Sequence, residues 1–217
     1  MKLNLINEKT YKRAEYLEQY LRATKIVISM TTDIDASRFV RGVKENGYRF
    51  YPAFLYTVTK VVNSHEEFRM GYSPEGHVGI WDEVCPSYII FHPADETMTR
   101  IFTPWQDDFY LFYSAATADM DKYESYRGIS IADVPPNTFD ASCAPWVRYR
   151  SLDLHVSNEG THLAPIITWG KFEPDSSGRI MMPLTMQIHH AAAEGFHVGR
   201  FFTEVQALCD TFFDSQK

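Results

Sequence analysis

The sequence predicts an α+β fold, a two-layer sandwich in which helices pack on a mixed β-sheet. Helical patterns gather in the first third and at the end of the chain, and strand patterns dominate the middle. The composition, 45% hydrophobic and 15% aromatic, is sufficient for a globular core. No internal repeat, low-complexity tract or Gly/Ser linker divides the chain. We therefore expect residues 1–217 to form a single domain.

The first part of the chain predicts three helices and one strand. Residues 11–21 carry apolar side chains at helical spacing, and residues 24–32 contain a β-branched run typical of a strand. Asp35 can cap a second helix that ends near Asn46-Gly47. Pro52 suits the first turn of a third helix, whose apolar face continues to Val62.

The middle of the chain is rich in short strands separated by Pro, Gly and Asp. The pattern predicts one helix over residues 107–126 and a hairpin turn at residues 176–178. The expected strands cover residues 78–81, 87–91, 97–102, 151–156, 164–172 and 180–189. A last helix follows Gly195, because apolar residues recur there at helical spacing.

Charge and cysteine content exclude several classes of protein. The net charge of −7 argues against a general nucleic-acid binder. No apolar run approaches the ~20 residues needed to span a bilayer, and the N-terminus lacks the apolar segment of a signal peptide. The three cysteines (Cys85, Cys143 and Cys209) are too few and too widely spaced for a disulfide framework or a zinc ribbon. We expect a cytoplasmic protein that binds neither membranes nor nucleic acid.

The run from Gln187 to His197, QIHHAAAEGFH, carries the clearest chemical signal. His190 follows a predicted strand, and Glu194 lies on the same side if the three intervening alanines are helical. Neutral imidazole is the usual general base near pH 7, so His190 is a candidate catalytic base. A surface His–Glu ion pair is the alternative.

A metal site built from the histidines of this run is a further alternative. Adjacent histidines on a strand point to opposite faces, so His189 and His190 are not expected to bind one ion. No cysteine is near, and the HExxH arrangement is absent. We therefore expect no metal, and we expect His189 to be a buried or interface histidine with a structural hydrogen bond.

The segment Ala141–Val147, ASCAPWV, is the second candidate. Taken alone, a serine before Pro-Trp indicates turn chemistry, and the segment is not a G-x-S-x-G nucleophile elbow. Together with the His-His run, however, it resembles the classical chloramphenicol acetyltransferases, whose signature reads Gln-apolar-His-His-x-x-x-Asp-Gly-Phe-His. The chain matches every fixed position except that Glu194 replaces Asp.

The resemblance implies roles for individual residues. Ser142 of Ser-x-x-Pro-Trp would donate a hydrogen bond to the oxyanion of the tetrahedral intermediate, beside Trp146. Arg13 would pair with the motif acid and brace the catalytic loop, and Thr168 of Pro-Ile-Ile-Thr would lie near the reacting centre. The substrate pocket would include positions where the family carries the same residue or another, mostly apolar one: Tyr20, Thr24, Ile26, Met98, Ile129 and Leu154.

The resemblance also implies a reaction and an assembly. The expected enzyme transfers acetyl from acetyl-coenzyme A to the primary hydroxyl of chloramphenicol without a metal or an acyl-enzyme. It would be a cytoplasmic homotrimer with active sites between subunits. One rival is a 2-oxo acid dehydrogenase acyltransferase core, which shares His-x-x-x-Asp-Gly but normally carries a lipoyl module that these 217 residues lack. Others are a homologue that binds aromatic compounds without turnover and an acyltransferase for another hydroxyl.

Overall fold

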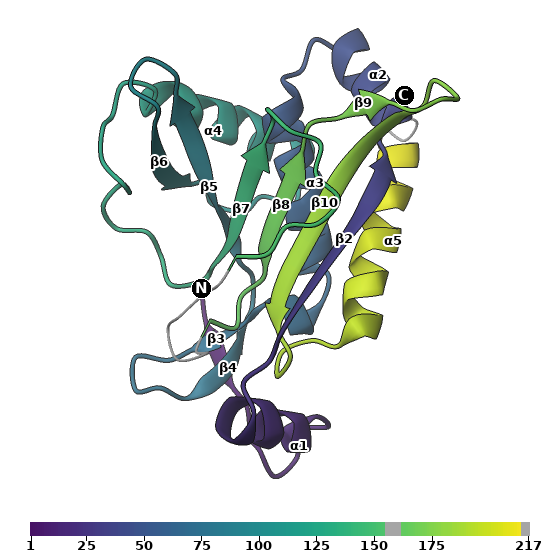
Figure 1. Ribbon diagram of the computed structural model, residues 1–217. Helices are drawn as coiled ribbons and strands as arrows, with labels where there is room; N and C mark the ends of the chain where they lie inside the picture. Colours follow the sequence, from purple (N-terminus) through teal and green to yellow (C-terminus); the bar gives the residue numbers. More distant parts are fainter. Residues whose placement is uncertain (155–161, 214–217) are drawn as a thin grey trace.

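A seven-stranded mixed β-sheet forms the centre of the protein in the computed structural model, which describes residues 1–154 and 162–213 (Figure 1). Its strand order is β2-β10-β8-β7-β5-β6, with β9 paired to β10 off this path. The sheet strands are β2 (Val27–Asp35), β5 (Cys85–His92), β6 (Thr97–Phe102), β7 (Thr138–Ala144), β8 (Ile166–Gly170), β9 (Glu173–Pro174) and β10 (Ile180–His189). A separate three-stranded sheet has the order β1-β4-β3, formed by Leu3–Leu5, Val78–Trp81 and Met70–Tyr72 respectively.

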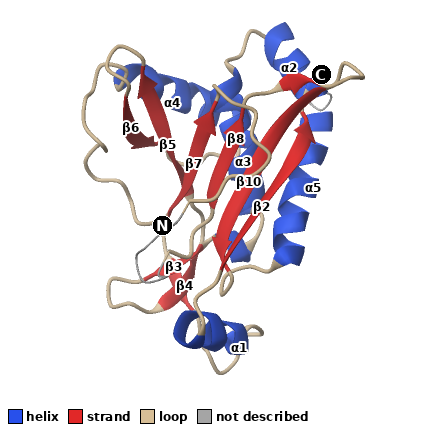
Figure 2. Ribbon diagram, viewed as in Figure 1, coloured by secondary structure: helices blue, strands red, loops and turns tan. Residues whose placement is uncertain are grey.

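The helices pack mainly on one face of the large sheet, as Figure 2 shows. They are α1 (Ala14–Leu17), which continues as a π-helical segment (Glu18–Ala23), α2 (Ser37–Glu45), α3 (Phe50–Asn63), α4 (Phe109–Lys122) and α5 (Gly195–Thr211). A 3₁₀ turn (Glu66–Phe68) follows α3. Helix α5 packs beside β2, whereas α4 packs beside β6. This two-layer arrangement confirms the predicted α+β fold.

Strand β10 positions the site because it is buried on both faces. Alternate side chains of a strand point to opposite sides, so Leu184, Met186 and Ile188 join the hydrophobic core between the sheet and the helices. Thr185, Gln187 and His189 alternate with them and therefore lie on the other face, where they are also buried. The last residue of the strand is His189, so the catalytic candidate His190 begins the turn that leaves the sheet.

The sheet opens between two parallel strands. The ladder of β5 and β7 runs from Cys85↔Thr138 to Tyr88↔Ala141 and ends there. Both strands continue beyond the last pair and diverge, which leaves a gap between them in Figure 1. Ser142 is the first residue of β7 beyond the ladder. The opening of the sheet therefore begins at a predicted site residue.

The structure corrects several predicted elements. The strand expected at 151–156 is not formed by residues 151–154, which are irregular, and the remainder lies outside the described residues. Strand β7 was not predicted, because the serine in its sequence TFDASCA precedes Pro-Trp and was interpreted as part of a turn. The helix expected at 11–21 is short and then widens into a π-helical segment. None of the helices within residues 1–154 and 162–213 combines the length and apolarity needed to cross a bilayer.

Candidate active site

His190 is held rigidly at the end of β10. Its backbone N–H donates to the carbonyl of Ile26 at 2.9 Å, which ties the turn to the start of β2. Its imidazole stacks on the Tyr20 ring, with centroids 4.1 Å apart and planes inclined by 16°. The side chain is half-buried. A partly exposed imidazole fixed by an aromatic ring is suited to proton transfer.

The residues after His190 form a tight turn and not the helix considered from the sequence. The backbone N–H groups of Ala192 and Ala193 both donate to the carbonyl of His189. Ala191, Ala192 and Ala193 are fully buried, so a larger side chain would not fit here without displacing the core. Because α5 begins only at Gly195, His190 and Glu194 occupy the two ends of this turn.

His189 is the buried histidine expected from the sequence. Its Nδ1 accepts the backbone N–H of Ala191 at 3.1 Å, and the residue is 1% exposed. Burial, assisted by the nearby His190, lowers the pKa of His189 below its usual value of 6.5. A neutral, enclosed ring of this kind stabilises the turn and has no access to a substrate.

Arg13 and Glu194 form the expected ion pair. Nη2 of Arg13 lies 3.3 Å from Oε1 of Glu194, and Nη1 donates to the carbonyl of Ala192 at 3.0 Å. The extra methylene of glutamate is accommodated, since Glu194 also serves as N-cap of α5 and accepts the backbone N–H of His197. Arg13 is only 6% exposed. The guanidinium therefore contacts both the middle and the end of the turn from His190 to Glu194, hereafter the catalytic turn.

Ser142 and Thr168 lie side by side on neighbouring strands. The parallel register pairs Ser142 of β7 with Thr168 of β8, and the next ladder pairs Thr168 with Thr185 of β10. Directly paired residues share a face of the sheet, so these hydroxyls form a row on the face opposite the helices. The Thr168 hydroxyl is buried and has no hydrogen-bond partner among the described residues. An orphaned polar atom of this kind can bind a polar group of a ligand.

One chain does not bring His190 and Ser142 together. His190 lies five residues beyond Thr185, which is level with Ser142 in the ladder. At about 3.3 Å per residue, the two are separated by roughly 16 Å along the sheet. Within the described ranges, no hydrogen bond, ion pair or ring contact joins them. The two residues of one chain are therefore too far apart to act on the same bond.

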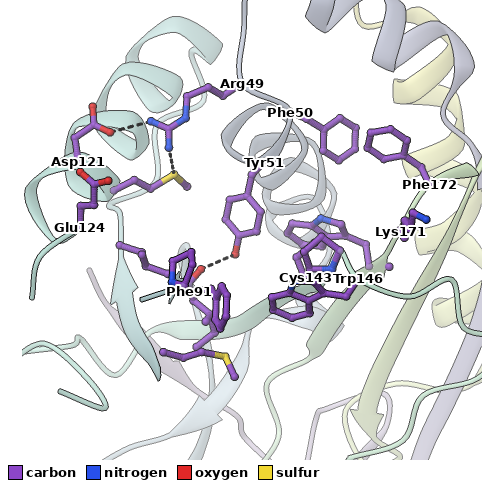
Figure 3. Close-up of a pocket in the computed structure, with 18 residues that line it drawn as sticks. Arg49, Phe50, Tyr51, Phe91, Asp121, Glu124, Cys143, Trp146, Lys171 and Phe172 are labelled. Atoms are coloured by element: carbon purple, nitrogen blue, oxygen red, sulfur yellow. Dashed lines mark hydrogen bonds and ion pairs between the residues drawn. The ribbon is translucent and has the colours of Figure 1, made fainter. Parts of the chain in front are cut away.

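A large cavity occupies the opening between β5 and β7. Its volume is about 870 Å³, and its walls come from the ends of β5, β7 and β8 together with the start of α3 and the end of α4. Figure 3 shows Phe50 facing Phe172 on one side, with Cys143 and Trp146 at the base. The lining also includes Arg49, Tyr51, Ile89, Ile90, Phe91, Pro93, Met98, Met120, Asp121, Glu124, Pro145, Trp169, Gly170 and Lys171.

Two basic side chains, Arg49 and Lys171, line this cavity. Arg49 pairs with Asp121 at 2.9 Å, and Lys171 pairs with Glu173 at 2.7 Å. Sequence reasoning missed both, together with Phe172. Arg49 directly precedes α3, and Lys171 directly follows β8. Basic residues at the ends of elements are a possible indication of an anion site, but the sequence alone does not show that these two ends lie together.

The remaining predicted pocket residues are dispersed. Trp146 and Met98 line the cavity, whereas Thr24 and Ile26 lie exposed near His190, in the segment that enters β2. The backbone N–H of Leu154 donates to Oε1 of Gln187 at 2.9 Å, which places this exposed leucine over β10. Ile129 is 90% exposed and is not among the residues that line the cavity. Apart from Ile129, the predicted set therefore falls into two groups, one near His190 and one near Ser142.

Comparison with known proteins identifies the family to which this site belongs. Residues 1–206 match the model of the chloramphenicol acetyltransferase family. The chain belongs to the chloramphenicol acetyltransferase family. A chloramphenicol acetyltransferase of Staphylococcus aureus is 38% identical over 211 residues, covering 97% of each chain. One from Clostridium perfringens is 37% identical over 214 residues, covering 98% of this chain and 97% of the relative.

Solved structures confirm the fold. A chloramphenicol acetyltransferase superposes with a TM-score of 0.85 at 21% identity, covering 96% of this chain and all of the other. A dihydrolipoamide acetyltransferase of Azotobacter vinelandii gives a TM-score of 0.67 at 13% identity, covering 87% and 84%. The sequence resemblance to the family is thus confirmed, and the fold is shared with the acyltransferase class considered as a rival.

Proposed function

We propose that the protein acetylates the primary hydroxyl of chloramphenicol with acetyl-coenzyme A, with His190 as the general base. Membership in the chloramphenicol acetyltransferase family makes the protein an acetyltransferase. The observation that carries the catalytic assignment is the placement of His190, whose ring stacks on Tyr20 while its backbone is tied to Ile26. Of the two adjacent histidines, only this one is open to a substrate.

The reaction follows from the chemistry of these side chains. His190 removes the proton from the acceptor hydroxyl, and that oxygen attacks the thioester carbonyl carbon. The carbonyl π electrons move to oxygen, and Ser142 donates a hydrogen bond to the resulting oxyanion. Collapse of the tetrahedral intermediate breaks the carbon–sulfur bond, and the imidazolium returns its proton to the leaving thiolate. The products are the acetyl ester and free coenzyme A, with His190 regenerated.

The cavity between β5 and β7 is the proposed site of the coenzyme. Its apolar lining suits the pantetheine chain and adenine ring, and the two basic side chains at its wall, Arg49 and Lys171, suit phosphate groups. Cys143 lies in the cavity wall directly after Ser142. A thioester delivered along the cavity would therefore reach the opening of the sheet where Ser142 is located.

We further propose that the active enzyme is a homotrimer with sites between subunits. The separation of roughly 16 Å between His190 and the Ser142 row supports this assembly, because a second chain must supply one of them. The exposed apolar side chains along β2, among them Val27 and Met30, offer a surface for that contact. We place the trimer in the cytoplasm, where its acetyl-coenzyme A substrate is found, with residues 1–217 as one domain.

The direct test measures coenzyme A thiol release with and without chloramphenicol. We expect release that depends on chloramphenicol, and we expect His190→Ala to lower kcat by about 10²–10⁴-fold. His65→Ala is the matched control, because His65 pairs with Glu204 of α5 and does not contact the turn after His190. Release without chloramphenicol, or activity of His190→Ala near that of the native enzyme, would contradict the proposal. Turnover of another hydroxyl compound but not of chloramphenicol would identify a different acceptor.

A further inference from the structure

A third histidine contacts the catalytic turn. His197 is the third residue of α5, and its side chain is only 14% exposed. Its Nδ1 accepts the backbone N–H of Glu194 at 3.0 Å and lies 3.5 Å from Nη1 of Arg13. Its Nε2 lies 3.3 Å from Oε1 of Glu67, a residue of the 3₁₀ turn after α3. The imidazole therefore links the end of the catalytic turn to a separate element of the fold.

The partners of His197 select one form of its ring. A backbone N–H and a guanidinium can only donate, so Nδ1 must present a lone pair to both. A neutral imidazole then carries its hydrogen on Nε2. That nitrogen faces a carboxylate, which can only accept. The geometry requires neutral His197 with the proton on Nε2.

Glu67 is fixed as the partner of that proton. Its other oxygen pairs with Nη2 of Arg200 at 3.1 Å, and the residue is only 9% exposed. Burial alone would raise the pKa of Glu67, but a backbone hydrogen bond and the nearby cations Arg200 and Lys12 help to lower it below its usual value. The carboxylate is thus ionised near neutral pH and holds the ring in one orientation.

Burial and the surroundings of His197 together oppose its protonation. Burial lowers its pKa, and the guanidinium groups of Arg13 and Arg200 add to this effect, whereas Glu67 and Glu194 act in the other direction. A proton on Nδ1 would remove the acceptor of the Glu194 N–H and place a third cation between the two arginines. The contact with the catalytic turn therefore exists only while the ring is neutral.

We propose that His197, oriented by Glu67, is a positioning residue for acetyl transfer. It anchors the backbone of Glu194, and the three fully buried alanines between Glu194 and His190 transmit that constraint to the catalytic imidazole. Arg13 holds the middle of the same turn through the carbonyl of Ala192. Displacement of a catalytic group by about 1 Å can lower a rate by about 10²-fold. This inference rests on the proposed function of His190.

Three variants separate positioning from simple stability. His197→Ala removes the acceptor, whereas His197→Asn keeps an amide oxygen near the position of Nδ1 and does not titrate. His65→Ala is the matched control, because His65 pairs with Glu204 of the same helix at 2.7 Å and does not touch the turn. We expect His197→Ala to lower kcat on the order of 10-fold to 100-fold with both KM values unchanged. His197→Asn should retain most of kcat, and His65→Ala all of it.

The state of the ring can be measured in the native enzyme as well. Nitrogen-15 NMR of labelled histidine should show His197 neutral at pH 7 with hydrogen on Nε2 and not on Nδ1. A Nδ1–H or charged ring would overturn the inference, as would His197→Asn that is as impaired as His197→Ala. An active native enzyme with unchanged kcat in His197→Ala overturns this inference alone. A native enzyme without acetyl transfer overturns the proposed function together with it.

Discussion

The pair Arg13–Glu194 gives the sharpest prediction about the catalytic turn. Arg13→Ala removes a charged hydrogen bond to the buried carbonyl of Ala192, which contributes about 1.5–3 kcal/mol, together with the ion pair. Glu194 is one-third exposed and can be rehydrated, so we expect a total loss of about 2–4 kcal/mol in the free energy of unfolding. Glu194→Ala leaves the guanidinium buried and removes the N-cap of α5, which alone contributes about 1 kcal/mol.

The double mutant distinguishes a true pair from two independent residues. Because each single mutation already removes the shared contact, the double mutant should cost about 1–2 kcal/mol less than the sum of the single mutants. The assay is urea unfolding with kcat measured on the same preparations. Arg22→Ala breaks an exposed ion pair with Glu18 and serves as control, with an expected loss below about 1 kcal/mol. Losses that add within about 0.5 kcal/mol would refute the pairing of Arg13 with Glu194.

Three further predictions follow from the site. Ser142→Ala should lower kcat by about 10²–10³-fold with little change in either KM, and a change confined to KM would assign Ser142 to ground-state binding. Lys171→Ala should raise KM for acetyl-coenzyme A but not for chloramphenicol; equal changes would remove Lys171 from the coenzyme site. Burial raises the pKa of the Cys143 thiol to about 12, so it is protonated at neutral pH. Cys143→Ala should therefore remain active, and its loss of activity would point to an acyl-enzyme.

The sequence allowed prediction of the parts that depend on local pattern. Strand β10 was predicted with its observed bounds, since its apolar run is long and ends in a specific motif. The fold class followed from the order of helical and strand patterns, and Arg13 and Glu194 were paired through the family resemblance. These inferences need only residues that are close in sequence or fixed by a motif.

The rest depends on contacts that no local pattern encodes. Strand β7 pairs with parallel neighbours on both sides, so its formation depends on β5 and β8 more than on its own residues. The cavity exists because β5 and β7 separate after four paired residues, which brings Arg49 and Lys171 to one opening. His197 was considered only as a possible metal ligand, because its partner Glu67 is 130 residues away in sequence.

The central claim is an acetyltransferase whose site combines His190 of one chain with Ser142 of another. The most direct measurement is chloramphenicol-dependent thiol release by a refolded equimolar mixture of His190→Ala and Ser142→Ala chains. In randomly mixed trimers, about one quarter of the sites would combine an intact His190 with an intact Ser142, so about one quarter of the native activity should return. A mixture no more active than either variant alone would contradict a site shared between subunits.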